Sequence, residues 1–64
     1  MIRRKRIEKR LTQDELSKIL KIDRSYLSKL ENKSFNRPSV KLIKQICRIL
    51  DIKSEDLFNF FYSE

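Results

Sequence analysis

Hydrophobic residues recur at helical spacing along most of the chain, and this pattern predicts an all-α fold. The clearest segment is 40–50, in which one side of a helix carries Ile43, Ile46, Cys47 and Leu50 at i, i+3, i+4 and i+7. Lysine, glutamine and arginine fill the other side. Ser39 is placed to cap this segment, which we expect to be the scaffold helix of a small core.

The segment 11–33 reads as two short helices joined by a tight turn. Thr12 and Glu15 have the spacing of a capping box, in which each side chain accepts the backbone amide of the other residue. An apolar stripe follows at Leu16, Ile19 and Leu20. Lys21 and Ile22 then interrupt the pattern, and the next helix begins within about three residues.

The second of these helices is expected to present a polar, basic stripe. Asp23 is placed to cap it, and Leu27 and Leu30 face inward. The opposite side carries two cations and three short hydrogen-bonding side chains but no acid: Arg24, Ser25, Ser28, Lys29 and Asn32. Such side chains can bond base edges or phosphates of DNA. A stripe of this kind also occurs on ordinary solvated helices.

Both ends of the chain are also expected to be helical. In residues 2–9 only Ile2, Ile7 and the stem of Arg6 can face a core, and the basic run by itself also fits a nuclear or heparin-type segment. Near the other end, Ser54 is placed to cap a last helix whose first turn is acidic, which suits the helix dipole.

The last seven residues contain four large aromatic side chains, Phe58, Phe60, Phe61 and Tyr62. One short helix cannot bury all of them against so small a body, so part of this surface is expected to form an interface. In the alternative interpretation, Leu57 and Phe61 complete the core, and the other aromatic residues lie on a frayed helix end and form no interface.

The length and charge of the chain limit the classes of function that it can have. Residues 1–64 are expected to form one domain, which at this size buries only about 60% of its extended surface and leaves little room for a catalytic cleft. Lysine and arginine number 16 against 9 acids, and the net charge of +7 favours nucleic acid or an anionic membrane surface as partner. No apolar run approaches the roughly 20 residues of a membrane span, and we expect a cytoplasmic protein.

Metal and redox chemistry are not expected. Cys47 is the sole cysteine and histidine is absent, so an internal disulfide or a zinc site cannot be assembled. We interpret Cys47 as a small core residue. The absence of histidine and of a glycine-rich loop also argues against an enzyme, a cofactor or a small-molecule substrate.

The chain resembles the phage-repressor type, or Cro-like (XRE), helix-turn-helix domain. The resemblance covers residues 2–58 and depends on Thr12-Gln13, Leu16, the run 25–31, Pro38-Ser39, Leu50, Ile52 and Leu57. It implies a compact five-helix bundle with the helix-turn-helix at the second and third helices. It also implies a regulator that binds double-stranded DNA with the third helix in the major groove.

The resemblance assigns further roles. Arg24, Ser25, Ser28 and Lys29 would contact bases, with Asn32 at the groove edge. Arg6 would pair with Glu31 and tie the first helix to the third. The expected phosphate contacts are Gln13, Asn36, Arg37 and Ser39, although Gln13 could also brace a recognition side chain, and Tyr26 either contacts a phosphate or packs. Family members usually have glycine where this chain has Arg10 and Lys21, and a positive φ there would cost about 1 kcal/mol.

The family dimerises on DNA through its carboxyl end, which implies a homodimer through Phe58, Phe60, Phe61 and Tyr62 with recognition helices about 34 Å apart. The expected function is therefore sequence-specific regulation, as a repressor of a two-fold operator. The alternative is a protein-interaction module that forms a heterodimer with another regulator through the same aromatic helix. RNA binding is less favoured, because side chains cannot enter the deep groove of A-form RNA.

Overall fold

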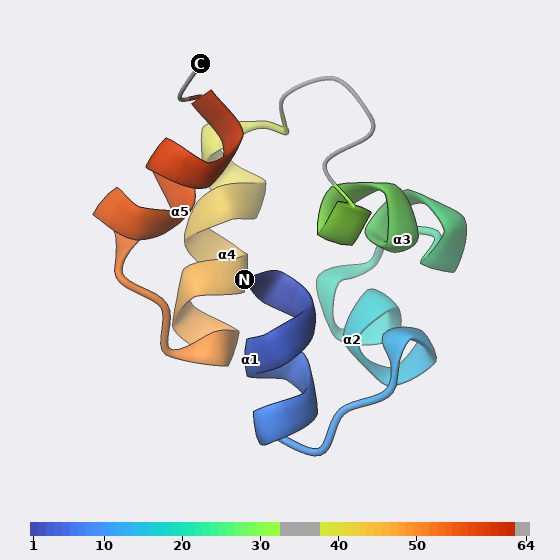
Figure 1. Ribbon diagram of the computed structural model, residues 1–64. Helices are drawn as coiled ribbons and strands as arrows, with labels where there is room; N and C mark the ends of the chain where they lie inside the picture. The colour runs from blue at the N-terminus through green and yellow to red at the C-terminus, as the bar shows by residue number, and fades with distance from the viewer. Residues whose placement is uncertain (33–37, 63–64) are drawn as a thin grey trace.

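The computed structural model of the protein describes residues 1–32 and 38–62, which contain five helices and no strand (Figure 1). Their bounds are α1 Ile2–Glu8, α2 Gln13–Leu20, α3 Arg24–Asn32, α4 Val40–Leu50 and α5 Ser54–Tyr62. The predicted all-α five-helix bundle is confirmed. In Figure 1, α2 and α3 lie on one side of α1, and α4 and α5 lie on the other.

Two of the predicted helix starts are confirmed by their capping bonds. The Thr12 hydroxyl accepts the Glu15 amide at 3.0 Å, and the Glu15 carboxylate accepts the Thr12 amide at 2.9 Å. At the start of α4, the Ser39 hydroxyl accepts the Leu42 amide at 3.2 Å. Ser54 does not cap α5 as predicted. It is the first residue of the helix, and the carbonyl of the residue before it, Lys53, accepts the Leu57 amide.

Three helices end in the same way, with a residue in the left-handed region. Arg10, Lys21 and Asp51 have φ angles of 59°, 58° and 55°. After each of them the next amide bonds back to the carbonyl five residues earlier, from Leu11 to Arg6, from Ile22 to Ser17 and from Ile52 to Cys47. This is the Schellman motif, in which glycine usually occupies the left-handed position. The chain uses two cations and an acid there instead.

The core brings together residues from all five helices and one linker. Its buried hydrophobic members are Ile2, Leu16, Leu20, Leu27, Leu30, Leu42, Ile43, Ile46, Cys47, Leu50, Ile52, Leu57 and Phe61. Cys47 is 7% exposed, as expected of a core residue, and burial raises the pKa of its thiol while a hydrogen bond with Ser54 opposes that rise.

Two residues expected to face the core do not. Ile7 is 56% exposed and Ile19 is 51% exposed, so both expectations were wrong. In α1 the buried pair is Ile2 and Arg6, at i and i+4, which turns Ile7 outward. In α2 the buried face contains Ser17, whose hydroxyl donates to the Asp14 carbonyl at 2.8 Å, and Ile19 lies outside it.

Candidate nucleic-acid interface

The polar stripe of α3 lies on the solvent side of that helix. Leu27 and Leu30 are fully buried and fix the opposite side against the core. Four members of the stripe are exposed, namely Arg24, Ser25, Lys29 and Asn32, and Ser28 is partly exposed. The helix therefore offers two cations and short polar side chains to a partner, as the sequence predicts.

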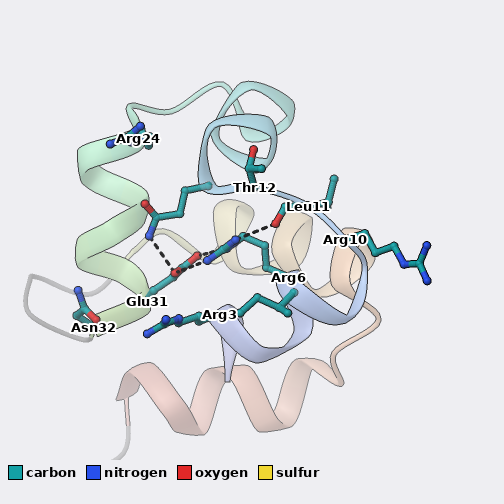
Figure 2. A pocket seen from close by; sticks show the side chains of 10 residues that line it. Arg3, Arg6, Arg10, Leu11, Thr12, Arg24, Glu31 and Asn32 are labelled. Atoms are coloured by element: carbon teal, nitrogen blue, oxygen red, sulfur yellow. Dashed lines mark hydrogen bonds and ion pairs between the residues drawn. The ribbon is translucent and has the colours of Figure 1, made fainter.

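A buried polar network holds α3 against α1 and the start of α2 (Figure 2). The ion pair predicted between Arg6 and Glu31 is present, with Arg6 Nε 2.8 Å from Glu31 Oε2, and the two side chains are 10% and 2% exposed. Arg6 also donates to the Leu11 carbonyl at 2.8 Å. Gln13 Nε2 donates to Glu31 Oε1 at 3.1 Å. The network joins the carboxyl end of α3 to α1 and to the start of α2.

An open hollow lies beside this network. Side chains of α1, of the α1–α2 connection and of α3 line it, including Arg3, Arg10, Arg24, Glu31 and Asn32. In Figure 2, Arg24 and Asn32 stand at opposite ends of α3, with Glu31 close to Asn32. The polar stripe of α3 and the hollow therefore share two residues, Arg24 and Asn32.

A helix-turn-helix family model matches residues 2–57 of the chain. The chain belongs to the XRE, or phage-repressor, helix-turn-helix family. This is a family of DNA-binding transcription regulators. Neither a protein of curated function nor a solved structure matches the chain.

Within the helix-turn-helix, formed by α2 and α3, Gln13 lies differently from a simple phosphate ligand. Its amide nitrogen points to Glu31, inside the protein. The Oε1 atom, on the other branch of the amide group, is an acceptor and would repel a phosphate oxygen. A phosphate contact by Gln13 would have to use its second N–H.

The other expected contacts of the helix-turn-helix domain divide into three groups. Tyr26 is half-buried and packs against the core. Ser39 caps α4, and its hydroxyl proton is available for a second bond. Asn36 and Arg37 lie outside the described residues.

At the carboxyl end of the domain, the structure separates the four aromatic residues. Phe61 is 6% exposed and belongs to the core, which leaves it little surface for a partner, contrary to the expected interface. Phe58 and Phe60 are half-buried, and Tyr62 is 38% exposed. The Tyr62 hydroxyl donates to the Pro38 carbonyl at 2.8 Å, which ties the end of α5 to the start of α4.

Arg3 is a residue of the hollow that the sequence interpretation missed. It is exposed and comes from α1, three residues before Arg6. This i, i+3 spacing was the available signal, because it places both arginines on one side of the helix.

In residues 1–32 and 38–62, no group of three or more histidine, cysteine or acidic side chains could hold a metal ion. No helix in the same ranges has the length and hydropathy required to cross a bilayer.

Proposed function

We propose that the protein is a sequence-specific transcriptional repressor that occupies a two-fold operator as a homodimer. The observation that carries the proposal is the exposed, acid-free stripe of α3, held by two fully buried leucines and by the Glu31 network. A helix held in this way can enter the major groove without reorganising. Bound at a promoter, the dimer would exclude polymerase.

In the proposed complex, Arg24, Ser25, Ser28 and Lys29 contact bases, and Asn32 lies at the edge of the groove. Arginine and lysine donate to guanine O6 and N7, and serine and asparagine bond several base edges. Gln13, Tyr26, Asn36, Arg37 and Ser39 are the proposed contacts to the phosphate backbone. Phosphate contacts set the register of the protein on the duplex but carry no sequence information themselves.

The proposed dimer contact is the exposed part of α5. Phe58, Phe60 and Tyr62 keep apolar surface outside the core, and the rings of Phe58 and Tyr62 lie in contact at a tilt of 34°, with centroids 5.8 Å apart. The protein measures 29 Å along its longest axis. A dimer that meets at α5 would have to set its two α3 helices about one DNA turn, or about 34 Å, apart.

The first test is selection of duplexes from a random pool, followed by binding of variants to the selected sequence. Arg24→Ala or Lys29→Ala should weaken binding by about 1 to 3 kcal/mol and relax preference at one base position. Arg37→Ala should weaken all sequences alike and reduce the salt slope by about 1. Lys44→Ala, which removes an exposed charge from α4, is the matched control and should change little.

Equal losses on selected and scrambled duplexes for Arg24→Ala, Lys29→Ala and Arg37→Ala would contradict the assigned roles. If the unchanged protein shows no salt-dependent binding to any duplex, the proposal fails as a whole. That second result would favour the protein-interaction module that uses α5 to capture another regulator.

A further inference from the structure

The hollow between α1 and α3 has an excess of positive charge. Among the described residues that line it there are four arginines, at positions 3, 6, 10 and 24, and a single acid, Glu31. The carboxylate of Glu31 is 2% exposed and is already engaged by Arg6 and Gln13. The surface that faces solvent therefore keeps the cations without a compensating acid.

Arg3 and Arg24 supply the accessible cations at the two ends of this hollow. Both side chains are exposed, and neither pairs with an acid of residues 1–32 or 38–62. Arg4, the neighbour of Arg3, differs because it pairs with Glu8 at 3.4 Å. In Figure 2 the side chain of Arg3 passes beneath Glu31 toward Asn32, while Arg10 points away.

The two arginines are assigned to different groups of the DNA. Eight residues separate Arg24 from Asn32, which at a rise of about 1.5 Å per residue sets the ends of α3 about 12 Å apart. Arg24 lies at the amino end, where it is proposed to contact a base. Arg3 lies at the carboxyl end beside Asn32, where α3 reaches the edge of the groove.

We propose that Arg3, together with Asn32, binds a phosphate of the DNA backbone at the carboxyl end of α3. The inference depends on the proposed function, since it adds a backbone contact from α1 to the same complex. Asn32 belongs both to the polar stripe of α3 and to the lining of the hollow, so the site is continuous with the proposed DNA surface. A guanidinium offers two parallel N–H donors that match the geometry of a phosphate.

The nearby amide of Gln13 strengthens this assignment. The Gln13 Nε2 atom donates to Glu31 at 3.1 Å, so this N–H is already used and Gln13 has fewer donors left for a phosphate. Arg3, which lines the same hollow, would supply a positively charged donor that Gln13 lacks. The contact would fix the depth and tilt of α3 in the groove without reading sequence.

The test compares Arg3→Ala with Arg48→Ala on the duplex selected above, by fluorescence anisotropy at several salt concentrations. Arg48 is exposed on α4, and its loss removes the same charge. Arg3→Ala should weaken binding by roughly 3- to 10-fold near 0.1 M salt and reduce the salt slope by about 0.9, with the same preferred sequence. Arg48→Ala should change affinity by less than about twofold.

Arg3→Lys should recover only part of the loss, because it keeps the charge but lacks the two parallel N–H donors, and thermal unfolding of each variant checks that the fold is intact. If Arg3→Ala and Arg48→Ala behave alike while the unchanged protein binds its duplex, the inference is wrong and the proposed function stands. If the unchanged protein binds no duplex, both are wrong. Binding of inorganic phosphate that requires Arg3, with duplex binding unaffected, would assign the hollow to a free anion and also overturn the proposal.

Discussion

At the scale of single residues, the chain accepts backbone strain that a glycine would avoid. Lys21 ends α2 with φ 58°, and two hydrogen bonds close the turn, from its own amide to Lys18 and from Ile22 to Ser17. A side chain with a Cβ in this region costs about 1 kcal/mol relative to glycine. The turn of the helix-turn-helix keeps its geometry because the hydrogen bonds and the packing of Ile22 against the core offset that cost.

Lys21→Gly is therefore expected to raise the free energy of unfolding by about 1 kcal/mol, because glycine adopts this conformation without strain. Lys44→Gly is the control. It makes the same change inside α4, where glycine should lower stability by about 1 kcal/mol. Urea unfolding followed by circular dichroism measures both. Destabilisation of similar size in the two variants would argue against strain at Lys21.

Asp51 is a second left-handed residue, and it forms an ion pair with Lys9. The hydrogen bond and the charge of Lys9 lower the pKa of Asp51 below the ordinary value of 3.8. Because the folded pKa lies below the unfolded one, the stabilising contribution is present above about pH 4 and disappears as the pH falls through the folded pKa. Both side chains are well exposed, so the contribution is small.

The titration of the Asp51 carboxyl carbon by NMR should accordingly have a midpoint below 3.8. Lys9→Gln should move that midpoint up toward the ordinary value, because it removes the largest cause of the shift. Lys53→Gln removes an equal charge two residues away from Asp51 and should move it less. A midpoint that Lys9→Gln leaves unchanged would show that the pair does not form in solution.

At the scale of helices, the bundle depends on one buried polar connection. Arg6 of α1, Gln13 of α2 and Glu31 of α3 meet through bonds of 2.8 and 3.1 Å. Buried charges are costly unless they are paired, so these groups stabilise the arrangement only as a set. The connection positions α3, since it joins α1 and α2 to the carboxyl end of α3.

Arg6→Met should lower the free energy of unfolding by about 3 to 5 kcal/mol, because it leaves the Glu31 carboxylate buried without its cation. Arg4→Met is the matched control on the same helix. Its pair with Glu8 is exposed, and its loss should cost less than about 0.5 kcal/mol.

Thermal and urea unfolding measure both variants, and adding Glu31→Met to Arg6→Met should restore much of the lost stability. An unfolded Arg6→Met protein that this second change rescues agrees with the prediction. Equal effects of Arg6→Met and Arg4→Met would contradict it.

At the scale of the whole molecule, the two ends of the bundle have different proposed tasks. In Figure 1, α3 and α5 lie on opposite sides of α1, so the proposed DNA surface and the proposed dimer contact do not compete for the same residues. Phe60 and Phe61 are adjacent in the sequence, and their rings pack edge to face with centroids 5.0 Å apart. Phe61 faces the core, and Phe60 keeps part of its surface outside it.

These neighbours give a direct test of the dimer. Phe61→Ala should lower the free energy of unfolding by about 3 to 5 kcal/mol, as expected for a buried aromatic side chain. Phe60→Ala should cost clearly less stability but weaken self-association by about fivefold or more, or about 1 kcal/mol. Unfolding curves and analytical ultracentrifugation separate the two effects. Unchanged self-association of Phe60→Ala would move the dimer contact away from α5.

The sequence by itself determined the helices and the family. Helix starts depend on side chains within three residues of one another, so the capping bonds of Thr12 and Ser39 could be predicted from local pattern. The pairing of Arg6 with Glu31 spans 25 residues and was predicted only through the family resemblance. Positive φ at Arg10 and Lys21 was anticipated in the same way, whereas Asp51 was not.

The tertiary structure decided which side of each helix is covered. An apolar stripe has two edges, and the neighbouring helices choose between them, so Ser17 is buried and Ile19 is not. The packing of the helices also places Phe61 in the core, Gln13 against Glu31 and Arg3 in the same hollow as Asn32. These placements result from contacts between residues far apart in the chain, and local periodicity carries no information about such contacts.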